Sequence, residues 1–167
     1  KNVITELIRC GFKVGITSNS HKAINHLMKV TAECCKAGSV AAKFSCAKDK
    51  DGELAALGIE ACSNTDLAAN IEDGYTVGTT AWGFCRDDVV ESLDYLFVDE
   101  AGQVATPNLV GMSRSAKNIV LMGDQMQLGQ PSQGVHPGDS GLSVLDYLMR
   151  DTPTISPDRG VFLGTTF

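Results

Sequence analysis

The chain has 167 residues, of which 43% are hydrophobic and 20% are charged. This length suits one ordinary domain and excludes a multidomain assembly within the chain. No apolar run is long enough to cross a bilayer, so a membrane partner is not expected. The net charge of −6 argues, taken alone, against a nucleic-acid partner, because phosphate binding normally requires a basic surface.

The charge is unevenly spread along the sequence. Residues 1–50 contain nine Lys and Arg against three Asp and Glu, an excess of six positive charges. Residues 51–167 contain five Lys and Arg against seventeen Asp and Glu, an excess of twelve negative charges. A basic segment is therefore joined to an acidic one, and the basic segment has the sign that phosphates attract.

Cysteine usage indicates a reducing compartment. The six cysteines include no C-x-x-C pair, and the sequence contains neither an Asn-x-Ser/Thr acceptor nor a secretory leader. Structural zinc ligands come in close pairs, so no zinc site is expected. The sequence therefore predicts reduced thiols in a cytoplasmic, intracellular protein.

Hydrophobic periodicity predicts helices and strands in alternation. An amphipathic helix over 1–10 stops at Gly11, and a strand over 12–17 leads to a helix over 21–36 that Asn19 or Ser20 caps. Further strands are expected over 40–45, 75–80, 95–98, 119–122 and 159–167, and helices near 105–115 and 140–150. Short apolar strands that alternate with helices favour a doubly wound α/β domain with a parallel sheet.

Two other features concern organisation. The segment at about 46–74 is polar and weakly periodic, and we expect a surface insertion with a possible helix over 65–72. The chain begins inside the pattern of a helix and stops inside the pattern of a buried strand. We therefore expect it to be a piece of a longer protein.

Polar residues follow four of the predicted strands, within 17–22, 79–82, 99–103 and 123–127. Such residues can simply begin loops, but in doubly wound sheets ligands bind beyond the carboxyl ends of the strands. The adjacent acids Asp99 and Glu100 are the sharpest case. Mg²⁺ on nucleotide phosphates needs an anchoring carboxylate, which Asp99 can supply. A water that attacks a γ-phosphate needs a proton acceptor nearby, and Glu100 has that position.

These residues resemble known motifs. Asp99-Glu-Ala-Gly-Gln103 resembles motif II of superfamily 1 helicases, and Leu121-Met-Gly-Asp-Gln-Met-Gln-Leu128 resembles their motif III. The segment from Val14 to Asn25 is similar to motif Ia, and Val77-Gly-Thr-Thr80 to the nucleic-acid contact motif that follows it. The best match is the branch of 5′-to-3′ DNA and RNA helicases, which includes members fused to RecB-like nucleases. The resemblance implies a RecA-like P-loop NTPase fold, with residues 1–167 forming the central part of the first motor domain and the second motor domain absent.

The resemblance also implies roles in ATP hydrolysis, with ATP and Mg²⁺ as cofactors of the intact parent. Asp99 would hold Mg²⁺, Glu100 would be the catalytic base, and Gln127 would reach the γ-phosphate. The remaining residues expected to bind nucleotide are Gln103, Asp124 and Phe167, the last by stacking on adenine.

On the nucleic-acid side, Ser20, His21 and Thr80 match positions that touch the single-strand backbone in the family, although His21 replaces the usual Asn. Thr79 belongs to the same motif as Thr80. Lys22 either lines a phosphate track or is a solvated helix residue. The implied partner is single-stranded nucleic acid, with DNA favoured over RNA, together with the remainder of the parent chain.

The single tryptophan, Trp82, directly follows this motif. It can stack on a base or belong to the core. Because Trp is highly buried on average, we expect a partly buried core residue.

The phosphate-binding loop G-x-x-x-x-G-K-[ST] is missing from the sequence. We therefore expect the 167-residue chain alone not to hydrolyse ATP. We also expect the parent's P-loop strand to lie between the 119–122 strand and the 159–167 strand. Two rival functions remain, another P-loop NTPase that acts as a switch and a degenerate scaffold that only binds partners.

Overall fold

The computed structural model describes residues 1–48, 52–124, 137–150, 152 and 154–162. The strands are β1 (Val14–Thr17), β2 (Lys43–Cys46), β3 (Ile59–Ala61), β4 (Tyr75–Gly78), β5 (Leu93–Val98) and β6 (Ala116–Leu121). The α-helices are α1 (Asn2–Arg9), α2 (His21–Ala37), α3 (Leu67–Glu72), α4 (Ala81–Phe84), α5 (Thr106–Ser113) and α6 (Val144–Met149). Short 3₁₀ turns are η1 (Ala55–Leu57), η2 (Asp87–Val89), η3 (Ala101–Gln103) and η4 (Gly138–Gly141).

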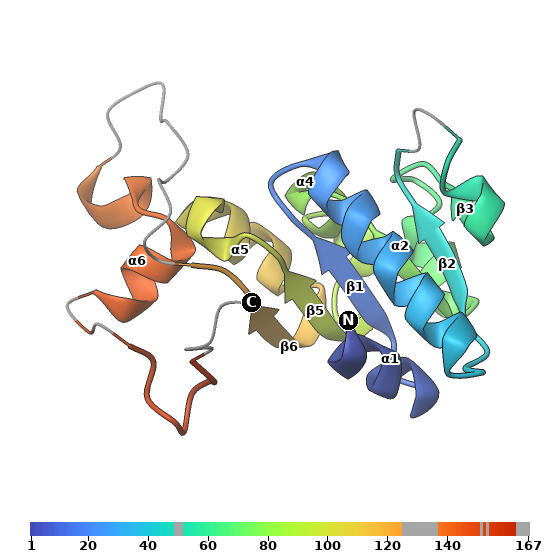
Figure 1. Ribbon diagram of the computed structural model, residues 1–167. Coiled ribbons are helices and arrows are strands. Elements are labelled where there is room, and N and C mark those ends of the chain that lie inside the picture. The colour runs from blue at the N-terminus through green and yellow to red at the C-terminus, as the bar shows by residue number, and fades with distance from the viewer. Residues whose placement is uncertain (49–51, 125–136, 151, 153, 163–167) are drawn as a thin grey trace.

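The strands form a six-stranded sheet in the order β3-β2-β4-β1-β5-β6, in which every neighbouring pair is parallel (Figure 1). The first strand, β1, lies between β4 and β5. On one side the chain forms β2 and the edge strand β3 before β4 takes the place between β2 and β1, and on the other side β5 and β6 follow in order. This architecture confirms the predicted α/β class with a parallel sheet flanked by helices, and it is consistent with a RecA-like fold.

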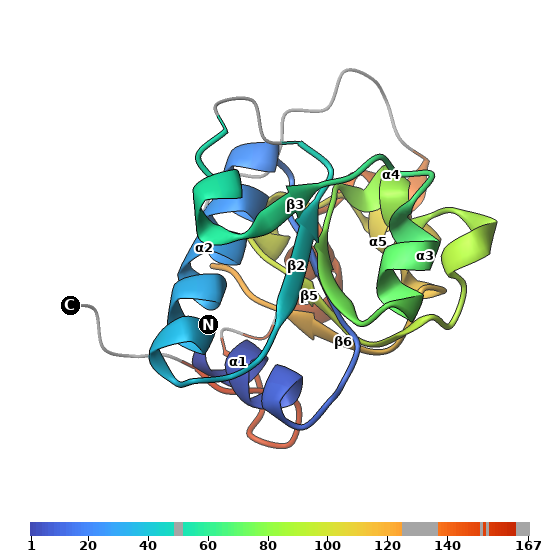
Figure 2. The ribbon, with the colours of Figure 1, turned by 90° about the vertical axis from the view of Figure 1, so that its right-hand side faces the viewer.

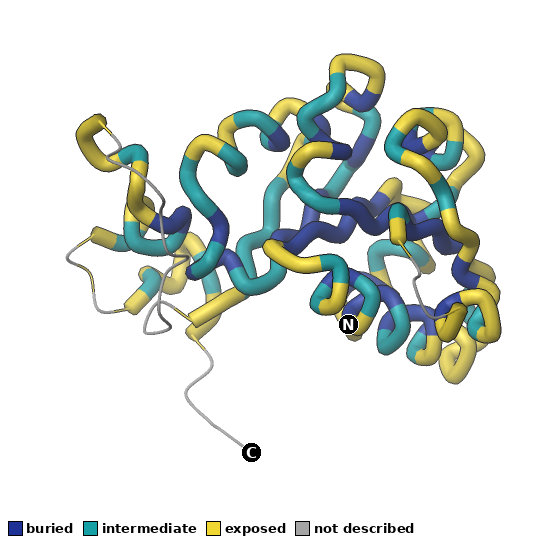
Figure 3. The backbone as a smooth tube through the Cα atoms, turned by 90° about the horizontal axis from the view of Figure 1, so that it is seen from above, coloured by how far each residue is buried: buried dark blue, intermediate teal, exposed yellow. Residues whose placement is uncertain are grey.

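Helices cover both faces of the sheet, as Figure 2 shows. Along β5 the side chains alternate between two cores: Phe97 packs with the α1 and α2 side, whereas Leu96 and Val98 pack with the side of α3, α4 and α5. All three are buried, which explains why the strand is apolar at successive positions. The buried backbone in Figure 3 accordingly runs through the middle of the domain.

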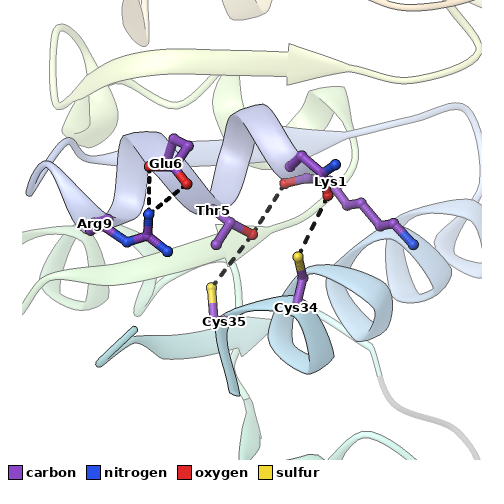
Figure 4. A network of polar contacts seen from close by, with 7 residues as sticks. Lys1, Thr5, Glu6, Arg9, Cys34 and Cys35 are labelled. Atoms are coloured by element: carbon purple, nitrogen blue, oxygen red, sulfur yellow. Dashed lines mark hydrogen bonds and ion pairs between the residues drawn. The ribbon is translucent and has the colours of Figure 1, made fainter. Parts of the chain in front are cut away.

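Polar contacts join helix α1 to helix α2 (Figure 4). The Cys35 thiol donates to Thr5 Oγ1 (3.8 Å), and the Cys34 thiol donates to Asn2 Oδ1 (3.6 Å). Burial raises the pKa of the Cys35 thiol, so this group stays protonated and acts as a donor. All six cysteines are free thiols in the structure.

The structure corrects two expectations about element boundaries. The segment 46–74, expected as a surface insertion, contains the helix expected over 65–72 as α3, whose Leu67 and Ile71 are buried in the core, and it also contributes an edge strand, β3, that the sequence did not predict. Residues 159–162, expected as part of a buried strand, form a turn followed by irregular chain, and Val161 is 83% exposed. A strand needs a neighbour for its backbone N–H and C=O groups, and no strand pairs with the outer edge of β6 among the described residues. Within those residues, no helix is both long and apolar enough to cross a membrane.

Asp94 joins three strands at the amino end of the sheet, so we predict that Asp94→Asn weakens the fold. Its carboxylate accepts from Lys117 Nζ (2.9 Å) and from the Lys13 amide (2.9 Å). Both contacts hold the pKa of Asp94 below its usual range. The stabilisation is therefore complete above the unfolded pKa of about 3.9 and is lost as the pH falls through the lower folded value.

At pH near 7, Asp94→Asn should lower the free energy of unfolding by about 1 kcal/mol, and the gap to the wild type should close below pH of about 4. Urea denaturation across pH measures both effects. Glu33→Gln, an exposed substitution on α2, is the control. A gap that is independent of pH would contradict the ionic role of Asp94.

Candidate functional site

The sheet brings the polar strand ends together. In register, Thr17 of β1 faces Val98 of β5, and Val98 faces Leu121 of β6. On the other side, Ile16 faces Gly78 of β4. Because all strands are parallel, the residues that follow them lie along one edge, which is the arrangement expected from the sequence.

The acid pair stands directly at the end of β5. The Asp99 amide donates to the Thr17 carbonyl (2.9 Å), which continues the ladder one residue past the strand. Asp99 Oδ1 accepts from the Glu100 amide (3.0 Å), and both side chains are partly exposed. Glu100 has left-handed backbone angles (φ 52, ψ 42). A non-glycine residue in this region costs roughly 1–3 kcal/mol, and such strain clusters at functional sites.

The motif II and motif III segments are in backbone contact. The Ala101 amide donates to the Met122 carbonyl (2.8 Å). A methyl group built on Gly102 would lie 2.6 Å from the Asp124 carbonyl oxygen, and one on Gly123 would lie 2.9 Å from the Ala101 nitrogen. The two glycines therefore permit an approach that no side chain would allow.

The structure describes two of the four other residues that are predicted to contact nucleotide. Gln103 is partly exposed at the end of η3, and its amide donates to the Glu100 carbonyl (2.8 Å). Asp124 is exposed beside Gly102. Gln127 and Phe167, also predicted to contact nucleotide, lie outside the described residues.

The motif Ia residues surround the beginning of α2. Ser20 caps this helix, and its Oγ accepts from the Ala23 amide (3.2 Å), as the sequence predicted. His21 is partly buried at the first helical position, and Lys22 is exposed. The capping bond gives Ser20 a structural role independent of any ligand.

A cleft of about 290 Å³ opens beside these residues, between the end of β1, the start of α4, and α5. We call it the α4–α5 cleft. Its lining is formed by Thr17–Asn19, His21, Thr80–Trp82, Val104, Asn108 and Met112.

The two neighbouring threonines of the contact motif differ in their surroundings. Thr80 lines the α4–α5 cleft. Thr79 is completely buried, and its hydroxyl donates to Asn64 Oδ1 (2.8 Å). The structure therefore offers the Thr80 side chain to a ligand and uses the Thr79 side chain within the fold.

The expectation that Trp82 belongs to the core is wrong, because its side chain is 78% exposed at the cleft. Phe84, two residues later on α4, is 1% exposed and faces the core. Positions two apart on a helix point in nearly opposite directions, so Phe84 takes the inner face and leaves Trp82 outside. The cleft is also lined by Ser18, which belongs to the polar segment 17–22, and by Asn108, which the sequence did not single out because a lone Asn carries no signal.

The donor set at the strand ends fits Mg²⁺ bound through a nucleotide. Carboxylate oxygens, such as those of Asp99, are the ligands this hard cation prefers. Among the described residues, no three His, Cys, Asp or Glu side chains are grouped closely enough to hold a metal by themselves. Mg²⁺ in proteins usually takes one or two carboxylates together with waters and substrate phosphates.

The all-parallel sheet with an acid pair at its carboxyl edge is consistent with a RecA-like fold. No family model matches the chain. The chain is 28% identical over 142 residues to the DNA replication ATP-dependent helicase/nuclease DNA2 of Gallus gallus, which covers 82% of the chain and 14% of that protein. It is 30% identical over 84 residues to the DNA replication ATP-dependent helicase/nuclease JHS1 of Arabidopsis thaliana, covering 50% of the chain and 6% of that protein.

These similarities confirm the resemblance to superfamily 1 helicases, including the branch fused to nucleases. The chain spans about 14% and 6% of the lengths of these two relatives.

Proposed function

We propose that this chain is the central part of the first RecA-like motor domain of an ATP-dependent helicase that translocates on single-stranded nucleic acid. The substrate would be DNA, in keeping with the names of the two relatives. The parent would be intracellular and would supply the P-loop and a second motor domain.

One observation carries the proposal: the acid pair and the α4–α5 cleft share backbone. The Thr17 carbonyl accepts from the Asp99 amide (2.9 Å), and Thr17 also lines the cleft. On the other side, the chain runs from Glu100 through η3 directly to Val104, another lining residue. If nucleotide hydrolysis moved the backbone of the acid pair, the cleft would move with it, because only a few residues separate the two.

The proposed division of labour follows from these positions. Asp99 would anchor Mg²⁺, which supplies charge neutralisation at the phosphates when bound. Glu100 would orient the attacking water and accept its proton. Gln103 and Asp124 would contact nucleotide, together with Gln127 and Phe167. Their roles rest on the family motifs.

Nucleic acid would run past the start of α2 and α4. Ser20, His21, Lys22 and Thr80 would contact the sugar-phosphate backbone, with Lys22 adding positive charge. The same motif includes Thr79, for which we propose a role in holding the Thr80 loop through its bond to Asn64.

Nucleotide hydrolysis by the longer parent protein, measured with and without single-stranded oligonucleotides, tests the proposal. A motor should be stimulated by single strands, and a comparison of DNA with RNA identifies the substrate. A nucleotide-dependent switch would hydrolyse ATP without such stimulation. A partner-binding scaffold would bind no nucleotide in the presence of Mg²⁺.

We predict that two substitutions at Ser20 separate its capping role from its contact role. Ser20→Ala should lower the free energy of unfolding by about 1 kcal/mol, because the α2 cap is lost. Ser20→Asp should keep the stability, because Asp also caps helices, yet weaken binding to single-stranded DNA because it places a negative charge near phosphate. Thermal denaturation and oligonucleotide anisotropy measure the two quantities. Unaltered DNA binding by Ser20→Asp would contradict a backbone contact at this position.

A further inference from the structure

We propose that the α4–α5 cleft is a base site, in which one unstacked base of the single strand lies against Trp82 and meets the Ser18 hydroxyl. This inference rests on the proposed function, and it concerns the bases, whereas the family motifs concern the sugar-phosphate backbone.

The Ser18 hydroxyl is the first reason. Ser18 is 4% exposed and lines the cleft, yet its Oγ has no hydrogen-bond partner among the described residues. A buried hydroxyl without a partner costs roughly 1–3 kcal/mol. Other buried hydroxyls have partners within the fold, including those of Thr79 and Thr31. Ser18 therefore has an unused donor and acceptor at the wall of the cleft.

Trp82 supplies the second reason. Its indole is 78% exposed although it lies at a cleft and in a short helix that packs on the core. An exposed aromatic ring beside a cavity is the stacking platform that proteins use for single-stranded nucleic acid, because every base has a π-face.

Apart from His21 and Thr80, for which we propose contacts to the sugar-phosphate backbone, the lining of the cleft suits a neutral ring better than a phosphate. Among the described lining residues, none is Lys, Arg, Asp or Glu. The apolar side chains of Val104 and Met112 stand together with the amides of Asn19 and Asn108. Apolar surface with a few polar groups suits a heterocycle that has both a flat face and hydrogen-bonding edges.

The size of the cleft agrees with this ligand. Its volume of about 290 Å³ lies at the lower end of the range of roughly 300–1,000 Å³ that small-molecule sites occupy. One ring system fits such a space better than several stacked nucleotides. The exposed Lys22 lies outside the lining, where it can meet the phosphates.

Because Trp82 is the single tryptophan of the chain, its fluorescence reports directly on the site. We expect single-stranded oligothymidylate of about 12 nucleotides to quench this fluorescence saturably. An abasic oligonucleotide of the same length, which has the phosphates without the bases, should bind more weakly and leave the fluorescence nearly unchanged.

The variants separate the base site from backbone binding. Trp82→Ala should weaken oligothymidylate binding by about 5- to 150-fold, without altering affinity for the abasic strand or the salt dependence, which reports phosphate contacts. Trp82→Phe should keep most of the affinity. Ser18→Ala should weaken binding of oligothymidylate alone, while the free energy of unfolding stays equal or rises because an unpaired buried hydroxyl is removed.

In the longer parent protein, the anisotropy of a labelled oligonucleotide measures the same affinities. This signal comes from the label, so it does not depend on how many tryptophans the parent contains. Equal affinity of Trp82→Ala and wild type for oligothymidylate would overturn the base site and leave the proposed function standing. Failure of both oligonucleotides to bind the wild-type parent would instead overturn the proposed nucleic-acid function, and the base site with it.

Discussion

Replacing Glu100 by Gln in the longer parent protein is expected to lower nucleotide hydrolysis by about 100-fold or more while nucleotide binding persists. Gln keeps the size and hydrogen-bonding capacity of the side chain but cannot accept the proton of an attacking water. Asp99, whose amide is fixed to Thr17, would still anchor Mg²⁺. Phosphate release and binding of a fluorescent ATP analogue measure the two steps. Hydrolysis at the wild-type rate would remove Glu100 from the mechanism.

The backbone of Glu100 allows a sharper version of this experiment. With φ at 52°, the residue occupies a region that glycine enters without strain. Glu100→Gly should therefore abolish hydrolysis while leaving the free energy of unfolding equal or higher. Glu91 has nearly the same φ of 53° but lies just before the amino end of β5, at the opposite edge of the sheet from Glu100, so Glu91→Gly is the matched control. It should have a similar effect on stability and none on hydrolysis.

If Glu100→Gly instead unfolds the protein, the left-handed turn depends on the glutamate side chain. If Glu91→Gly also abolishes hydrolysis, the loss at Glu100 reflects the backbone rather than the carboxylate. The comparison thus distinguishes strain retained for a catalytic side chain from strain without a function.

The sequence predicts those parts of the fold that local signals determine. Helix α2 has an apolar stripe and a capping serine at position 20, and both function as the pattern indicated. The central strands β4 and β5 are short and apolar because helices cover both faces of the sheet. Such signals are contained within a few neighbouring residues.

Other features depend on contacts between distant residues and gave no local signal. Strand β3 is three residues long with one buried side chain, Ile59, and its pairing with β2 decides its conformation. Conversely, Val161 and Phe162 are apolar but exposed, since hydrophobicity alone provides no partner strand. Among the described residues, pairing explains both differences.

The same distinction applies to the candidate site. The positions of Asp99, Glu100 and Thr80 at the carboxyl edge were predicted because each follows an apolar strand and belongs to a segment that resembles a family motif. The availability of each side chain did not, because it depends on packing: Thr79 is buried against Asn64, whereas Trp82 is exposed.

The segments resembling motifs II and III approach each other closely at Gly102 and Asp124. Gly102→Ala should lower the free energy of unfolding by about 1–3 kcal/mol, because the new methyl group would lie 2.6 Å from the Asp124 carbonyl oxygen. A carbonyl fixed in the backbone cannot rotate away as a long side chain can, so one of the two segments must shift. In the parent protein, that shift displaces the turn that carries Glu100, and hydrolysis should fall together with stability.

A double substitution shows whether this loss arises from one shared contact. A methyl group on Gly123 would meet the Ala101 nitrogen at 2.9 Å, across the same junction. Once one glycine has been replaced and the segments have separated, the second replacement should cost less, so the effects of Gly102→Ala and Gly123→Ala should not add. Gly38→Ala, where no atom lies closer than 3.3 Å, is the control, and urea denaturation of all four variants completes the cycle. Strictly additive losses would mean that the two glycines serve separate contacts, and that motifs II and III are not coupled through their backbones.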